Sequence, residues 1–213
     1  MWQRIAQSFS RTETGTNTGD SGDFLPRQAA ILHVDVVGST QRVRSNPALA
    51  HRQIEQLYAR LCFLGDMHNA IPRELRGDAA VIEFASVACA VRAAQALHAA
   101  HAAMSHSRLG LENPRIRTGI SFGEIIGDKM ITGEAVIRAQ RLEQLSEPGE
   151  VLIDQPAADR LTQTDGFELF HRDTRVLKGF DESVSIYRVE PDSGPVMASS
   201  RGPSDQQMIQ CVA

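Results

Sequence analysis

Cysteine, aromatic residues and long apolar runs are all scarce in this sequence. Its 3 cysteines are too few and too scattered for a disulfide framework or a zinc site. No apolar segment approaches the roughly 20 residues needed to cross a bilayer. The first residues, MWQRIAQSFSR, lack the apolar core of a signal peptide. The net charge of −4 gives no basic footprint for nucleic acid. We therefore expect a reduced, soluble, cytoplasmic protein without a nucleic-acid or membrane partner.

The composition divides the 213 residues into three parts. Residues 1–24 include the turn-rich stretch TETGTNTGDSGD, which predicts a flexible N-terminal segment. Residues 191–213 include DSGPVMASSRGPSDQQ, which predicts a disordered C-terminal tail. The apolar periodic segments lie in residues 25–190, which we expect to form one domain.

The stretch 28–40, QAAILHVDVVGST, carries the strongest signal in the chain. Its dense apolar and β-branched run predicts a strand buried on both faces, interrupted by Asp35. A buried carboxylate costs several kcal/mol unless a cation or a donor compensates it. Gly38 permits a tight turn, Ser39 or Thr40 can cap a following helix, and free amides there suit a phosphate. The alternative is a strand-end acid satisfied by neighbouring amides, and a metal site requires a second carboxylate.

The remaining patterns predict an α+β fold. Leu49, Gln53, Leu57, Leu61 and Leu64 mark a helical stripe, and alanine-rich residues 87–104 predict another helix. Extended segments flank Gly77-Asp78 as in a β-hairpin, residues 116–122 alternate as a strand, and a helix follows from residue 134 to about 145. Later strands cover 150–154, 167–176 and 184–189. This order suits a ferredoxin-like core with a central mixed sheet flanked by helices.

Asp78 supplies the second carboxylate. The first strand of a ferredoxin-like sheet is central and the hairpin packs beside it, so Asp35 and Asp78 can converge on one or two hard cations. Arg141 can neutralise phosphate charge, and its alternative role is that of an ordinary surface arginine. His98 and His101 lie one helical turn apart without an acid or a cysteine, so a solvated helix face is the preferred interpretation over a metal site.

These segments together resemble one family. HVDVVGST and RGDAAVIEF resemble the two metal-aspartate motifs of class III nucleotide cyclases. IRTGISFGEII is similar to their next core strand, and GEAVIRAQRLEQLSEPGEVLID is similar to their arginine helix and following strand. LKGFDESVSIYRVE is similar to their closing hairpin. The five motifs occur in the family's order over roughly residues 28–190.

The resemblance implies a head-to-tail homodimer with two catalytic sites at its interface. Asp35 and Asp78, with the backbone of Val36, would hold two Mg²⁺ or Mn²⁺ ions. The ribose 3′ hydroxyl of a nucleoside triphosphate would attack the α-phosphorus and expel pyrophosphate. Arg141 of the other subunit would stabilise the transition state and Lys178 would contact the triphosphate. The backbone amides that would cradle the phosphates belong to Val37, Gly38, Ser39 and Thr40.

Several positions depart from the family pattern. Glu74 stands where the family has its purine-selecting lysine, as in guanine-specific members, and Met130 falls near the second selector. Ile137 replaces the transition-state asparagine. The connection between Ile126 and Gly133 is several residues shorter than usual.

Arg76 is a further departure, because that position is usually apolar. Glu74, Arg76 and Asp78 share one face of an extended strand. A glutamate acceptor beside an arginine donor suits uracil or guanine, and the alternative is an ion pair without base contact. Small chains with altered selectors resemble the pyrimidine cyclases of bacterial anti-phage systems, whose cyclic UMP or cyclic CMP activates a separate effector protein. We therefore expect UTP, then CTP, as the substrate. The alternatives are a guanylyl or adenylyl cyclase and a catalytically inactive, cyclase-like dimeric binding module.

Overall fold

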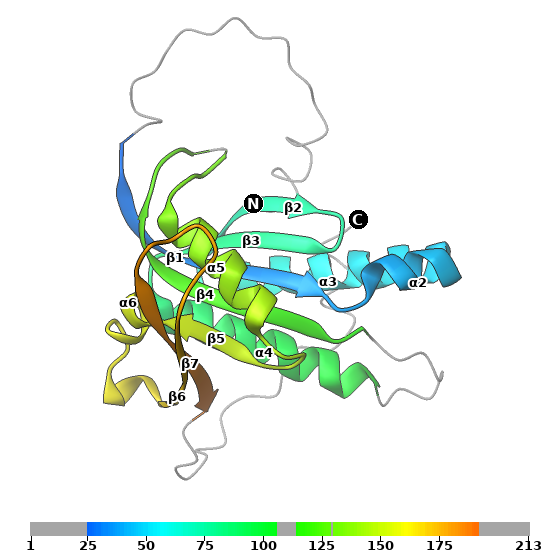
Figure 1. Ribbon diagram of the computed structural model, residues 1–213. Coiled ribbons are helices and arrows are strands. Elements are labelled where there is room, and N and C mark those ends of the chain that lie inside the picture. Colours follow the sequence, from blue (N-terminus) through cyan, green and yellow to red (C-terminus); the bar gives the residue numbers. More distant parts are fainter. Residues whose placement is uncertain (1–24, 106–113, 129, 192–213) are drawn as a thin grey trace, which may run out of the picture.

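The computed structural model describes residues 25–105, 114–128 and 130–191 of the chain. In these residues seven strands form one mixed sheet in the order β2-β3-β1-β4-β5-β7-β6 (Figure 1). The strands are β1 (Arg27–Val36), β2 (Ile71–Arg76), β3 (Ala79–Phe84), β4 (Ile116–Ile125), β5 (Val151–Asp154), β6 (Phe167–Val176) and β7 (Ser183–Pro191). The helices are α2 (Ser39–Ser45), α3 (Pro47–Met67), α4 (Val87–Ser105), α5 (Glu134–Leu145), α6 (Gln155–Ala158) and the 3₁₀ turn η2 (Gln163–Asp165). None of these helices is long and apolar enough to span a bilayer.

Strand β1 lies in the middle of the sheet. It pairs antiparallel with β3 on one side and with β4 on the other. Residues 29–34 and 36 are buried, which confirms the predicted strand with two buried faces, and Asp35 is half-buried. Because the pleat alternates, even-numbered β1 side chains point to one face of the sheet and odd-numbered ones, including Asp35, to the other.

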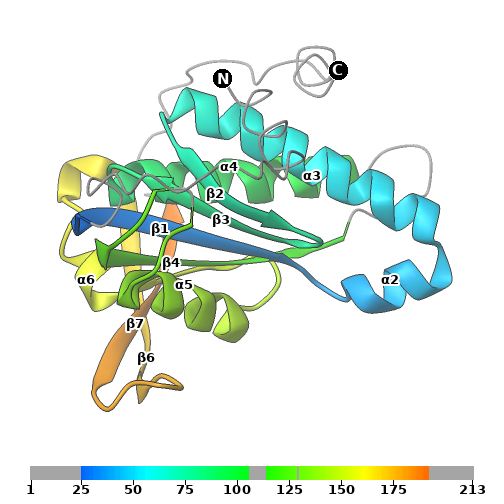
Figure 2. The same cartoon turned by 90° about the horizontal axis from the view of Figure 1, so that it is seen from above.

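Helices cover both faces of the sheet (Figure 2). Helices α3 and α4 lie over the even-numbered face, where Leu57 and Leu97 join the main core cluster with Leu32 of β1. Helix α5 lies over the odd-numbered face, where Ala139 packs in a second cluster with Ile31. Asp35 is therefore on the same side of the sheet as α5.

The predicted architecture is confirmed: a mixed sheet lies between helices, with a hairpin at Gly77-Asp78 and a helix over residues 134–145. The flexible segment predicted for residues 1–24 lies outside the described residues. So does the predicted C-terminal tail, except for Pro191, which ends β7.

Two local predictions were wrong. Neither Ser39 nor Thr40 caps a helix: α2 begins at Ser39, and Gly38 occupies the N-cap position with a left-handed φ of 69°. His98 and His101 do not lie on a solvated face. His98 Nε2 lies 3.0 Å from Thr118 Oγ1, and burial lowers the pKa of both histidines to about 4.

Candidate active site

The pairing of β1 with its neighbours brings the two predicted carboxylates together. Asp35 is opposite Ala79 in β3, and Asp78 directly precedes Ala79 at the tip of the β2–β3 hairpin. The two carboxylates are close enough for the charge of Asp78 to raise the pKa of Asp35. The predicted convergence of the two side chains therefore agrees with the fold.

An arginine that the sequence did not single out compensates Asp35. Arg117 is opposite Asp35 in β4, and its Nη2 donates a hydrogen bond to Asp35 Oδ2 over 2.7 Å. Burial raises the pKa of Asp35, and this hydrogen bond opposes the rise. The cost of the half-buried carboxylate is thus offset by a strand neighbour as well as by any bound cation.

Glu143 of α5 is a buried carboxylate that contacts Arg117 and His33. Its Oε1 lies 3.1 Å from Arg117 Nε, and its Oε2 lies 3.7 Å from His33 Nδ1. Burial raises the pKa of Glu143 to about 7, and the charges of Asp35 and Asp78 add to the rise. Burial also lowers the pKa of His33 to about 4, so the imidazole is neutral and contributes no cation near neutral pH.

The donor chemistry of this group fits divalent metal ions. No cluster of three or more His, Cys, Asp or Glu side chains that could hold a metal occurs in the part of the chain that the structure describes. Asp35 and Asp78 are nevertheless two carboxylates at one end of the sheet, with one guanidinium between Asp35 and Glu143. Excess negative charge on oxygen donors is the environment that Mg²⁺ and Mn²⁺ prefer.

The turn after β1 keeps only part of its predicted phosphate-binding capacity. The Val37 amide donates to the carbonyl of Arg115 over 2.9 Å, so it is not free for a phosphate. No side chain caps the start of α2. The backbone from Gly38 to Thr40 therefore stays the predicted phosphate contact.

The two predicted cations of the site form a separate group. Arg141 Nε donates to the main-chain oxygen of Lys178 over 3.2 Å, and Arg141 Nη1 donates to Gln144 Oε1 over 3.3 Å. Ile137, one turn earlier on α5, is 44% exposed. The positions expected to stabilise the transition state therefore lie on the outer surface of α5.

The predicted base selectors are also exposed. Arg76 Nε lies 3.1 Å from Glu74 Oε1, so the two side chains share one face of β2 and form an ion pair. Met130 is 78% exposed. The ion pair was the alternative to base contact, and it also presents an acceptor and a donor side by side.

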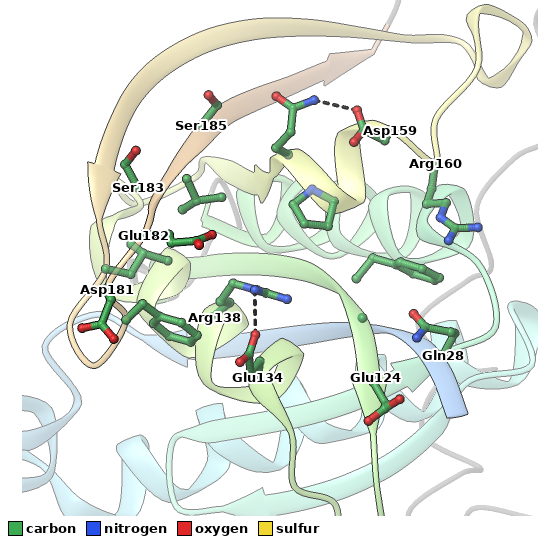
Figure 3. Close-up of a pocket in the computed structure, with 17 residues that line it drawn as sticks. Gln28, Glu124, Glu134, Arg138, Asp159, Arg160, Asp181, Glu182, Ser183 and Ser185 are labelled. Atoms are coloured by element: carbon green, nitrogen blue, oxygen red, sulfur yellow. Dashed lines mark hydrogen bonds and ion pairs between the residues drawn. The ribbon is translucent and has the colours of Figure 1, made fainter. Parts of the chain in front are cut away.

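A pocket of about 880 Å³ beside α5 is not this site (Figure 3). Neither of the predicted metal carboxylates and neither of the predicted cations lines it. Its charged lining is mainly acidic: Glu124, Glu134, Asp159, Asp181 and Glu182 against Arg138 and Arg160. Arg138 already pairs with Glu134 and Asp154, so the pocket offers little to a triphosphate.

Several solved structures with this architecture are nucleotide cyclases. The guanylyl cyclase Cya2 superimposes with a TM-score of 0.73 at 20% identity, covering 83% of this chain and 98% of that one. The adenylyl cyclase CyaB from P. aeruginosa superimposes with a TM-score of 0.71 at 19% identity, covering 84% and 97%. The chain has the fold of a class III nucleotide cyclase catalytic domain.

The curated sequence relatives include an uncharacterised protein and a putative adenylate cyclase. An uncharacterised protein of Mycobacterium tuberculosis is 28% identical in an alignment of 175 residues, which covers 75% of this chain and 31% of the relative. "Putative adenylate cyclase 3" of Rhizobium meliloti is 26% identical over 167 residues, 78% of this chain and 28% of the relative. The chain thus spans about a third of the length of the curated relatives that it matches. No protein-family model matches it.

Proposed function

We propose that this chain is a nucleotide cyclase that converts a nucleoside triphosphate to its 3′,5′-cyclic monophosphate and pyrophosphate. The observation that carries the proposal is the placement of Asp35 and Asp78 at one end of the sheet of a cyclase fold. Asp35, Asp78 and the Val36 carbonyl would hold Mn²⁺ or Mg²⁺. The bound ions would supply charge neutralisation and activation of the ribose hydroxyl.

The chain's own residues divide the remaining work between two copies. Arg117 orients Asp35, and the backbone from Gly38 to Thr40 contacts phosphate oxygens. Arg141 and Lys178, which form a separate group in one chain, face the carboxylates of a second copy in a homodimer. Arg141 stabilises the charge that develops on the phosphate in the transition state.

The base-selecting face favours a base with neighbouring N–H and carbonyl groups. Glu74 can accept a hydrogen bond and Arg76 beside it can donate one, which suits the N3–H and the carbonyls of uracil. UTP, followed by CTP, is therefore the proposed substrate, and an effector protein in anti-phage defence would read the product. GTP is the alternative to a pyrimidine triphosphate, because guanine presents the same groups and because Cya2 is a guanylyl cyclase.

Competition among the four nucleoside triphosphates with Mn²⁺ tests the proposal. We expect pyrophosphate release, and cyclic UMP as the main product by mass spectrometry. Cyclic GMP or cyclic AMP as the main product would overturn the pyrimidine assignment while leaving the cyclase intact. The absence of pyrophosphate with every triphosphate would support an inactive binding module instead.

Complementation tests the shared site. Asp35→Ala and Arg141→Ala should each lose about 10²–10³-fold in rate. Mixing the two variants should restore activity, because one interface of the mixed dimer keeps both groups. Failure to restore activity after demonstrated subunit exchange would rule out a site built from two copies.

A further inference from the structure

Arg73 is a buried arginine placed by an irregularity in β2. The register between β2 and β3 shifts between Pro72 and Glu74, so Arg73 sits in a β-bulge. A bulge turns the extra residue away from the regular alternation of the strand. The side chain of Arg73 is 7% exposed, whereas that of Arg76 on the same strand is 86% exposed.

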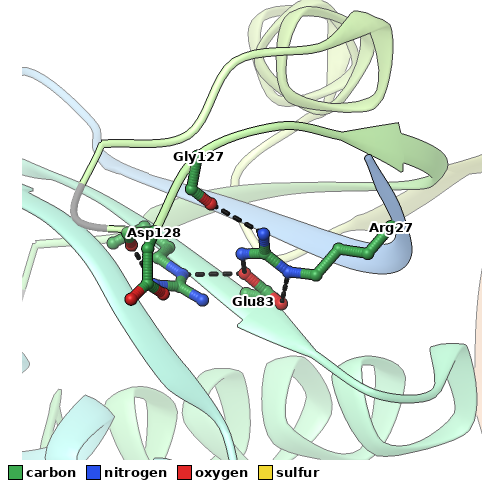
Figure 4. Close-up of polar contacts among 5 residues, drawn as sticks. Arg27, Glu83, Gly127 and Asp128 are labelled. Atoms are coloured by element: carbon green, nitrogen blue, oxygen red, sulfur yellow. Dashed lines mark hydrogen bonds and ion pairs between the residues drawn. The ribbon is translucent and has the colours of Figure 1, made fainter. Parts of the chain in front are cut away.

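Two arginines share the buried carboxylate of Glu83 (Figure 4). Arg73 Nε donates to Glu83 Oε2 over 2.7 Å, and Arg27 Nε and Nη2 donate to Oε1 and Oε2 over 3.1 and 2.9 Å. Burial alone would raise the pKa of Glu83, but the hydrogen bonds from Arg27 and Arg73 outweigh it and lower the pKa. Glu83 is therefore ionised, and it fixes both guanidinium groups.

The outer nitrogens of the same arginines hold the connection between β4 and α5. Arg27 Nη1 donates to the carbonyl of Gly127 over 2.7 Å. Arg73 Nη1 donates to the next carbonyl, that of Asp128, and lies 3.2 Å from Asp128 Oδ1. Two consecutive carbonyls of the β4–α5 connection are thus bound to β1 and β2.

The two sides of this connection pair with each other. Ile126 and Thr132 exchange two backbone hydrogen bonds of 2.8 and 2.9 Å. Gly127 has a φ of 98°, and a Cβ at this position would collide with the carbonyl of Met130. The contacts of Arg27 and Arg73 therefore bear on the position of Met130.

The network joins the two segments that carry the base selectors. Glu74 is the residue after Arg73, and Met130 is two residues after Asp128. A sheet edge does not need a buried ion-pair network for stability, because replacing such groups by apolar residues is often neutral or stabilising. In several proteins, buried polar groups fix one geometry among several alternatives.

We propose that Arg73, together with Arg27, is a positioning residue for base selection, which holds the Glu74 segment and the Met130 turn in one fixed arrangement. The proposal rests on the proposed cyclase function and names a further determinant of its specificity. Loss of the arrangement lowers discrimination between bases more than it lowers turnover, because neither arginine is a predicted contact of the reacting phosphate.

The test compares Arg73→Lys, Arg27→Lys and the control Arg188→Lys. Lysine keeps the charge beside Glu83, but its single ammonium group cannot replace a planar fork that binds a carboxylate and a carbonyl together. Arg188 forms an ion pair on β7 and belongs to none of the predicted site residues. We expect faster hydrogen exchange at the Ile126 and Thr132 amides in the first two variants. We also expect the ratio of kcat/KM between the preferred and the next triphosphate to fall by about 10-fold. A loss of this size is within the range that a small misplacement of a positioning group causes. The control should change neither.

An unchanged ratio in Arg73→Lys, or an equal fall in kcat for all four triphosphates, would overturn the proposal. If Arg73→Lys does not fold, the same ratio of kcat/KM is measured in Arg27→Lys, because Arg27 is only half-buried and its substitution disturbs the fold less. Absence of any cyclic product from the wild type would contradict the proposed function alone. The dissociation constants of the four triphosphates then replace kcat/KM, and equal selectivity in variant and wild type still overturns this proposal.

Discussion

Arg117 binds Asp35 across the β1–β4 pairing, with 2.7 Å between Nη2 and Oδ2. The two residues are direct cross-strand partners, so the backbone register itself sets the contact. Nε of the same guanidinium lies 3.1 Å from Glu143 Oε1. A single arginine therefore orients a predicted metal ligand on β1 and holds a buried carboxylate on α5.

Replacing Arg117 by methionine should lower the turnover of the proposed cyclase reaction by about 10²-fold, because a small misplacement of a ligand is costly. The substitution also leaves Glu143 buried without its cation. Unfolding free energy should fall by about 1 kcal/mol, the lower end for such a loss, because solvent screens the partly exposed arginine. Steady-state kinetics and urea unfolding measure the two effects, with Arg188→Met as the control. Turnover equal to that of the wild type would show that Arg117 does not orient the site.

The sequence predicts the carboxylate pair but not the arginine between Asp35 and Glu143. Asp35 interrupts an apolar strand and Asp78 lies at a hairpin glycine, so local patterns locate both. The alternation of Arg117 with Ile116 and Thr118 predicts which face of β4 its side chain lies on. It does not predict which residue that side chain contacts. Its role depends on β4 pairing with β1 in one register, and that of Glu143 on how α5 crosses the sheet. The strand register and the helix crossing are both features of the tertiary structure.

The same reason explains the errors at the histidines and at the first turn. The burial of His98 and His101 is set by the packing of α4 against β4 and α3, which the spacing of two histidines does not reveal. At Gly38 the glycine takes the cap position that Ser39 or Thr40 was expected to fill. Short polar residues after a glycine do not determine where a helix begins.

Lys178→Met should raise KM for the triphosphate more than it lowers kcat. Arg141 binds the main-chain oxygen of Lys178, so replacing the lysine side chain leaves the anchor of Arg141 in place. Arg141→Lys should show the opposite split, with kcat falling by about 10²–10³-fold, since it removes the group that we propose acts in the transition state. Measurement of kcat and KM for both variants separates the roles. A fall in kcat alone for Lys178→Met would contradict them.

His101 should make stability depend on pH between about 4 and 6.5. Its pKa in the folded protein is about 4, lowered first by burial and then by the charge of Arg60. In this pH window the unfolded chain binds a proton at His101 that the folded chain does not bind, so the unfolding free energy falls as pH falls. Above about pH 6.5, His101 does not change the unfolding free energy.

The measurement is urea unfolding of the wild type and His101→Gln at pH 5 and 6. One proton corresponds to about 1.4 kcal/mol per pH unit, which is the largest difference in slope that we expect. The raised pKa values of Glu143 and Asp154 act in the opposite direction. They act equally in both proteins, so the comparison isolates His101. Identical slopes would show that His101 is protonated in the folded state.

Gly119→Ala should destabilise the protein far more than Gly123→Ala, although both glycines lie on the α5 face of β4. A Cβ on Gly119 would lie 2.7 Å from Leu142 Cβ and would also overlap the amide of Glu143 and the carbonyl of Ala139, which are helix backbone. A Cβ on Gly123 would meet the end of the Arg138 side chain at 3.2 Å, which can move.

Overpacking of this kind costs about 1–3 kcal/mol, and we expect Gly119→Ala at or above the top of that range. Because the displaced helix carries Arg141 and Glu143, kcat should fall with stability in Gly119→Ala and stay near the wild-type value in Gly123→Ala. Thermal unfolding and kcat of the two variants provide the check. Equal Tm values for the two variants would mean that α5 can move away from β4 without loss of stability. Close packing of α5 on Gly119 would then not be required to hold Glu143 in place.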